Sequence, residues 1–88
     1  MDITVTTLSK EEFSKMDFSK WGTWECGVSI FPWSYDATET CYILAGHVVV
    51  ETKNGKTEFK QGDLVVFPKG LTCKWNVLEP VRKYYKFE

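Results

Sequence analysis

The sequence lacks paired cysteines, long apolar runs and an excess of charge of either sign. Its three cysteines are an odd number and none stands in a CxxC pair, which argues against a disulfide framework or a structural zinc site and favours a reducing compartment. No apolar run approaches the ~18 residues that a membrane span needs. The formal net charge is −1 with both signs interspersed, so we expect neither a nucleic-acid nor a membrane partner.

What the chain does have is aromatic surface. Its 88 residues predict one small domain, and four Trp, four Tyr and six Phe must supply much of the core. Small domains of this kind often cover part of that surface by self-association, and a bare sheet edge favours the same outcome, so we expect a homodimer. Residues 1–5 do not resemble a secretory signal. We therefore expect a cytoplasmic protein, or an organellar one if a transit peptide has been removed.

Only the first quarter of the chain has a helical pattern. Ser9-Lys10-Glu11-Glu12 is a capping box, in which the Ser9 hydroxyl and the Glu12 carboxylate each satisfy a free amide at the start of the helix. Phe13 and Met16, three residues apart, would then turn an apolar edge toward the rest of the domain. We assign residues 1–22 to an N-terminal arm with this short helix, and residues 23–88 to a single domain of strands.

The remainder of the chain alternates like strands. From Trp24 to Ile30 apolar and small or polar residues alternate, which predicts one half-buried strand ending at Pro32. Further strands are predicted at 39–45, 47–53, 56–60, 64–67, 72–78 and 81–87, with turns between them. Asn54-Gly55 predicts a type I′ hairpin, because that turn needs positive φ at both central residues. Short strands at this spacing predict an all-β antiparallel sandwich or barrel.

Two stretches of the chain match the spacing of a known pair of sequence motifs. The first motif has two histidines one residue apart, then a glutamate, then six residues to a glycine. Glu39 and Gly46 hold the last two places, whereas Trp33 and Tyr35 stand where the histidines would be.

The second motif is matched in its turn residues but not in its ligand. It runs from a glycine through Pro-x-Gly to a histidine and then an asparagine. Gly62, Pro68 and Gly70 match these places, while Cys73 replaces the histidine and Val77 the asparagine.

From Trp33 to Val77, the chain therefore resembles a small antiparallel cupin barrel, a jelly roll of the RmlC-like type. The runs Glu-Thr-Cys-Tyr-Ile-Leu, Gly-Asp-Leu-Val-Val-Phe-Pro-Lys-Gly-Leu and Glu-Pro-Val-Arg-Lys-Tyr-Tyr resemble the small single-domain cupins of the ureidoglycine aminohydrolase-like group. Larger relatives in that group bind manganese and release ammonia from a ureido compound. This chain has neither their histidines nor a second cupin domain, which weakens the inference that it shares that reaction.

The ligand set of a metal cupin is mostly gone. By position, Glu39 is the one conventional ligand that remains, and Cys73 is a soft substitute. A Tyr35 phenolate would be costly, because a phenol ordinarily has a pKa near 10. The single histidine, His47, lies outside the motif places and is interpreted as a solvated or edge-strand residue. We therefore predict no metal and no other cofactor.

The motif positions would all face the interior of a closed barrel. We predict a ligand site there, mostly apolar with a few convergent polar groups, formed by Trp33, Tyr35, Glu39, Cys73 and Trp75. The alternative is that Trp33 and Trp75 simply fill the space, in a structural or interaction protein.

Glu39 decides between these functions. A buried carboxylate is costly unless it is paired, metal-bound or protonated, and aromatic faces around one carboxylate favour ammonium groups. The leading hypothesis is a cupin that binds a small polar molecule, amine- or ureido-bearing. The alternative is an aminohydrolase-like or isomerase-like enzyme with Glu39 as acid or base, assisted by Tyr35 and Cys73. Arg82 and Lys83 point to opposite faces; an inward Arg82 could pair with Glu39, although a surface ion pair is the favoured interpretation.

Overall fold

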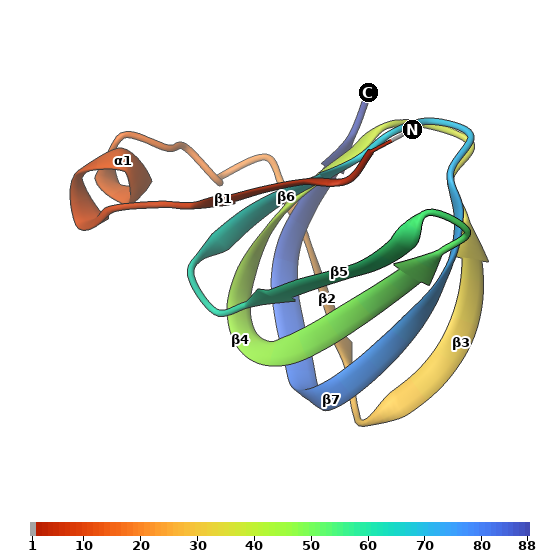
Figure 1. Ribbon diagram of the computed structural model, residues 1–88. Helices are drawn as coiled ribbons and strands as arrows, with labels where there is room; N and C mark the ends of the chain where they lie inside the picture. Colours follow the sequence, from red (N-terminus) through yellow and green to blue (C-terminus); the bar gives the residue numbers. More distant parts are fainter. Residues whose placement is uncertain (1) are drawn as a thin grey trace.

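The computed structural model describes residues 2–88 and is built almost wholly of antiparallel strands (Figure 1). The elements follow one another as β1 (Thr4–Thr7), α1 (Lys10–Ser14), β2 (Gly22–Cys26), β3 (Ser29–Ser34), β4 (Glu39–Thr52), β5 (Gly55–Lys60), β6 (Asp63–Phe67) and β7 (Thr72–Phe87). Within these residues no helix is long and apolar enough to cross a membrane. The predicted all-β antiparallel fold with a short N-terminal helix is confirmed.

Two long strands, β4 and β7, organise the fold. The first half of β4 pairs with β6 and with the second half of β7, whereas its second half pairs with β5 and with the first half of β7. Both strands bend sharply (Figure 1). The sheet is thereby folded into a first layer, β1-β6-β4-β7-β2, and a second layer, β5-β4-β7-β3. The buried core lies between these two layers.

The bend is made by bulges rather than by turns. The register of β4 against β7 shifts three times between Ile43 and Val48, and Gly46 adopts a φ of +102°. A Cβ atom at position 46 would lie 2.4 Å from the Pro80 carbonyl oxygen, so only glycine lets the two backbones approach here. The predicted breaks at Gly46 and at Glu79-Pro80 were therefore wrong, because both strands run through these residues.

The predicted strand from Trp24 to Ile30 is in fact two strands. β2 pairs with the second half of β7 and β3 with the first half, so the chain passes from one layer to the other at Gly27 and Val28. The second strand also continues through Pro32 to Ser34. Proline is tolerated there because, among the described residues, β3 pairs with β7 alone and leaves its other edge without a partner.

The Asn54-Gly55 hairpin forms, but its turn is not type I′. Thr52 is paired with Gly55, which leaves Lys53 and Asn54 as the connecting residues. No non-glycine residue among positions 2–88 has a positive φ, so the type I′ prediction is wrong. The Asn54 amide instead donates to the Thr52 hydroxyl at 3.1 Å.

The N-terminal arm packs on the outer face of the first layer. Its capping box is confirmed: the Ser9 hydroxyl accepts from the Glu12 amide at 3.1 Å, and the Glu12 carboxylate accepts from the Ser9 amide at 3.0 Å. The helix presents Phe13 to Tyr42, with 5.0 Å between ring centroids. Before the helix, the arm contributes β1 to the sheet, a strand that the sequence pattern did not predict.

Candidate functional site

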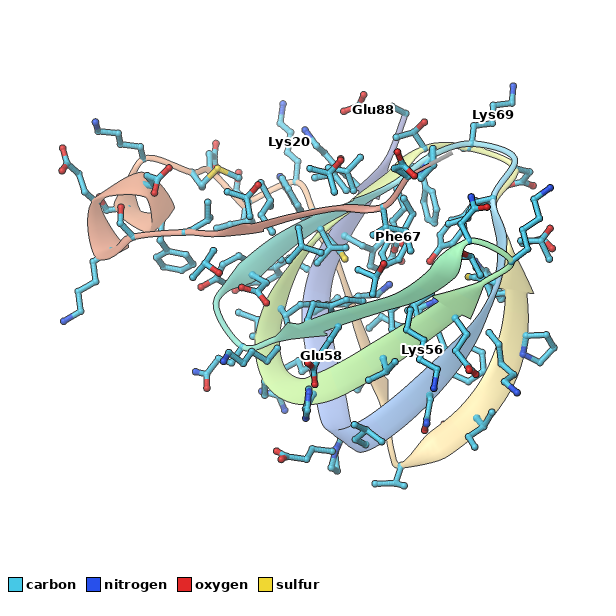
Figure 2. All side chains as sticks on the ribbon, viewed as in Figure 1. Lys20, Lys56, Glu58, Phe67, Lys69 and Glu88 are labelled. Carbon is cyan, nitrogen blue, oxygen red and sulfur yellow. The ribbon has the colours of Figure 1, made fainter. Side chains whose placement is uncertain are left out.

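A pocket of about 200 Å³ opens between the two layers on the side of β2 and β3. The rest of the interior contains buried aromatic rings, among them Phe67, which points into the barrel (Figure 2). The walls of the pocket are aromatic, and its charged groups are a glutamate and a lysine. The lining residues are Trp24, Phe31, Trp33, Tyr35, Glu39, Trp75, Lys83, Tyr85 and Phe87.

The polar end of the pocket is a buried ion pair. Lys83 Nζ donates to Glu39 Oε2 at 2.8 Å, and the two side chains are only 7% and 4% exposed. Glu39 is the first residue of β4, while Lys83 lies on β7. Strand alternation places Lys83, Tyr85 and Phe87 on the same face of β7, toward the pocket. The carboxylate that the motif spacing singled out is thus partnered by a cation from the protein itself.

An aromatic cage surrounds the Lys83 ammonium. Its Nζ atom lies 4.8 Å from the ring centroid of Trp75, 5.0 Å from that of Trp24 and 6.0 Å from that of Tyr85. These distances are within the range in which a ring face attracts a cation. The sequence predicted that aromatic rings and a carboxylate would select an ammonium ligand. In the structure Lys83 already occupies that position.

Arg82 lies on the opposite face of the same strand. Its guanidinium donates to Glu25 on β2 at 3.3 Å, and both side chains are mostly exposed. An Arg82–Glu39 pair is therefore excluded, whereas the surface ion pair that we favoured is present. Such an exposed pair contributes little to stability.

Tyr35 holds the wall of the pocket in place. Its hydroxyl accepts from the Trp75 indole N–H at 3.2 Å, and its ring stacks on Phe67 with 4.9 Å between centroids. Burial, reinforced by the neighbouring Glu39, raises the pKa of the Tyr35 phenol well above its ordinary value. The group therefore stays protonated. It can exchange hydrogen bonds, but it cannot serve as a base or a phenolate ligand near neutral pH.

Cys73 does not join the other predicted residues. It is 6% exposed and lines a separate groove together with Glu51 and Thr52. Burial raises the pKa of its thiol, so little thiolate forms near neutral pH. Of the five predicted ligand-binding residues, the structure brings Trp33, Tyr35, Glu39 and Trp75 to one pocket and leaves Cys73 outside it.

The donor atoms at the motif positions do not fit a metal. Residues 2–88 contain no group of three or more histidine, cysteine, aspartate and glutamate side chains placed to share an ion. Glu39 is engaged by Lys83, and a neighbouring ammonium opposes the binding of a cation. His47 lies on the outside of the β4–β5 hairpin, where its ring pairs with Glu58.

Several residues of the pocket were not predicted from the sequence. Trp24, Phe31, Tyr85 and Phe87 add rings to the wall, and Lys83 adds the charge that balances Glu39. Strand alternation required either Arg82 or Lys83 to face inward, but it did not indicate which of the two.

The folded two-layer barrel and its interior pocket define a small cupin. Residues 13–85 match the EutQ-like cupin domain family, and the chain belongs to that family.

Solved structures agree with this assignment. A DUF861 family protein from Thermotoga maritima is 48% identical over 99% of this chain and 100% of its own, with a TM-score of 0.92. The Clostridium difficile EutQ protein is 21% identical over 97% of this chain and 66% of its own, with a TM-score of 0.70. A putative ethanolamine utilization protein Q from Salmonella typhimurium LT2 is 24% identical over 97% and 68%, with a TM-score of 0.69. The last two likenesses show the fold alone.

The search of curated proteins returned no match to this chain. The finer resemblance to the ureidoglycine aminohydrolase-like group stays a prediction.

Proposed function

We propose that the pocket binds a small, neutral, planar molecule that carries an amide or urea group. One observation carries this proposal: a buried Lys83–Glu39 pair forms the polar end of an otherwise aromatic pocket. The pair places a hydrogen-bond donor directly beside an acceptor. A carbonyl with an adjacent N–H is complementary to it, because the carbonyl oxygen can accept from Lys83 while the N–H donates to Glu39.

Charge selects against the other ligand classes. An amine would bring a second positive charge beside the Lys83 ammonium, and a carboxylate would approach Glu39. A neutral group avoids both repulsions. We therefore retain the ureido form of the expected small polar ligand and abandon the amine form.

The aromatic wall sets the body of the ligand. The rings of Trp24 and Tyr85 lie 5.0 and 6.0 Å from the Lys83 ammonium, whereas Trp33 and Phe87 are about half exposed. Flat apolar groups pack well on such faces. An engineered cavity of ~150 Å³ accommodates benzene, so about 200 Å³ suits a molecule of roughly six to ten heavy atoms.

The enzyme hypothesis finds less support in the site. It asked Tyr35 and Cys73 to assist Glu39, but the Tyr35 phenol stays protonated and Cys73 lies outside the pocket. The filled-barrel hypothesis accounts for the part of the interior where Phe59, Phe67 and Trp75 pack together. It does not account for the open pocket beside these rings.

The test is a matched series of ligands that share one ring. Benzamide, phenylurea, benzylamine and benzoate are titrated into the protein and followed by ligand-observed NMR and tryptophan fluorescence. We expect the amide and the urea to bind about tenfold more tightly than the two charged compounds, a difference of about 1.4 kcal/mol. Tighter binding of benzylamine, or no binding by any of the four, would contradict the proposal.

Variants locate the site. The double variant Lys83→Met with Glu39→Gln removes both charges without leaving either one unpaired, and it should lose the preference for the amide and the urea. Arg82→Met is the matched control, because its side chain lies on the outer face of the same strand. It should bind as the unaltered protein does.

A further inference from the structure

We infer that Lys83 forms an imine with small aldehydes that enter this pocket. The inference rests on the proposed ligand site and deepens it, because it assigns a covalent reaction to the same pocket. The reactive atom is Lys83 Nζ, and the substrate class is an aldehyde with a flat or short apolar body.

Lys83 differs from the other lysines in its surroundings. Its side chain is 7% exposed and lines the pocket, and it is the buried lysine of the described chain. Lys20, Lys56 and Lys69 are exposed and extend from the surface (Figure 2). A lysine enclosed by apolar walls is the usual setting of an imine-forming amine, because water neither solvates the nitrogen nor readily reaches the product.

Glu39 supplies the proton transfers. Its Oε2 atom, 2.8 Å from Lys83 Nζ, accepts one proton from the ammonium and leaves a neutral amine. The nitrogen lone pair attacks the aldehyde carbon, and a proton moves from nitrogen to the former carbonyl oxygen to give a carbinolamine. Glu39 then returns its proton to that hydroxyl, the C–O bond breaks, and water leaves as the C=N bond forms.

The reaction keeps one positive charge inside the aromatic cage. Ammonium and aldehyde become iminium and water, so no net proton, electron or co-reactant is required. One positive charge remains at Nζ, beside Glu39 and within the distances already given for Trp24 and Trp75. An iminium spreads its charge over nitrogen and carbon and is less strongly hydrated than an ammonium. Aromatic faces therefore stabilise the product cation well.

The test is reductive trapping. The protein is incubated with benzaldehyde and sodium cyanoborohydride near neutral pH, and the modified residues are mapped by peptide mass spectrometry. We expect one benzyl group on Lys83, added at least about tenfold faster than on any exposed lysine, because a positioned acid–base group typically gives 10²–10⁴-fold. Equal or faster labelling of exposed lysines such as Lys56 and Lys69 would overturn the inference.

Two controls separate the imine from simple exposure. Lys83→Arg keeps a cation beside Glu39 but removes the nucleophile, so the fast adduct should disappear while the exposed lysines react as before. Glu39→Gln should slow labelling of Lys83 by roughly 100-fold if the carboxylate transfers the protons. Should that variant not fold, added benzamide is used instead, and it should slow labelling of Lys83 alone. If benzamide binds the protein but leaves the labelling of Lys83 unchanged, the pocket is excluded as the site of reaction.

The two proposals fail in different ways. If benzamide and phenylurea bind but aldehydes do not label Lys83, only the imine is excluded. If Lys83 is labelled selectively while no amide or urea binds, the imine stands and the neutral-ligand proposal fails. If neither occurs, both are excluded.

Discussion

Replacing Lys83 by methionine is expected to cost much of the stability of the fold. The substitution keeps most of the side-chain volume but leaves the Glu39 carboxylate, 4% exposed, without its cation. Breaking a buried ion pair by removing one partner typically costs ~3–5 kcal/mol. With a urea slope of about 1.5 kcal/mol/M, the midpoint of unfolding should fall by about 2–3 M at pH 7, as followed by tryptophan fluorescence.

Adding Glu39→Gln to Lys83→Met supplies the decisive comparison. The double variant leaves neither partner of the Lys83–Glu39 pair buried with an uncompensated charge, so it should recover most of the loss and lie within about 1.5 kcal/mol of the unaltered protein. The matched surface control is Lys15→Met, which breaks the exposed Lys15–Glu11 pair and should cost about 0.2–0.5 kcal/mol. A loss below about 1 kcal/mol for Lys83→Met, or no recovery in the double variant, would refute the reasoning.

Three further predictions concern the bend, the core and the open edge. Gly46→Ala should lower the free energy of unfolding in urea by about 3 kcal/mol, because it combines a strained φ with a backbone clash. Gly27→Ala, with open space around the added methyl group, should change stability little. Equal effects of the two variants would contradict the account of the bend. Burial raises the pKa of the Cys41 thiol from 9.0 to about 12, so between these pH values the thiol ionises in the unfolded chain but not in the folded protein. The free energy of unfolding should therefore fall between pH 9 and 12, by about 1.4 kcal/mol per pH unit more than in Cys41→Ala. Parallel pH profiles of the two proteins would exclude this contribution. The expected homodimer stays a prediction, and light scattering at high micromolar concentration should detect it; if it forms through the free edge of β3, where Ile30 is 63% exposed, Ile30→Lys should yield monomers.

Features set by local sequence were predictable. The capping box needs only Ser9 and Glu12 at the right separation, and it forms as expected. The motif spacing identified Glu39 as a pocket residue, because the glycines and the proline of a cupin fix where its strands begin.

Features set by distant pairing were not predictable in the same way. Alternation along 81–87 could not decide whether Arg82 or Lys83 faces inward, because the register shifts at the bend set the phase of the strand. The same limit explains the missed break at Gly27, since β2 and β3 pair with different halves of one long strand. The local pattern of apolar residues does not indicate which part of β7 each strand pairs with.

The position of Cys73 shows a further limit of motif spacing. The spacing placed this thiol inside the barrel, and it is buried there, but the large rings nearby determine where the open space lies. The shape of a pocket depends on side-chain volumes across both layers, which a motif does not specify.

The most direct test of the account is an NMR titration of protein made with carbon-13-labelled lysine. If the Lys83 ammonium lies against the rings of Trp24 and Trp75, ring currents should shift its ε-methylene protons upfield of the lysines that lie over no ring. Lys86, 5.0 Å from the Trp21 centroid, should also be shifted, so the Lys83 signal is assigned by its loss in Lys83→Arg, and benzamide should move that signal alone. A Lys83 ε-methylene signal that coincides with those of the lysines over no ring, and that benzamide does not move, would contradict the caged ion pair and the binding site built on it.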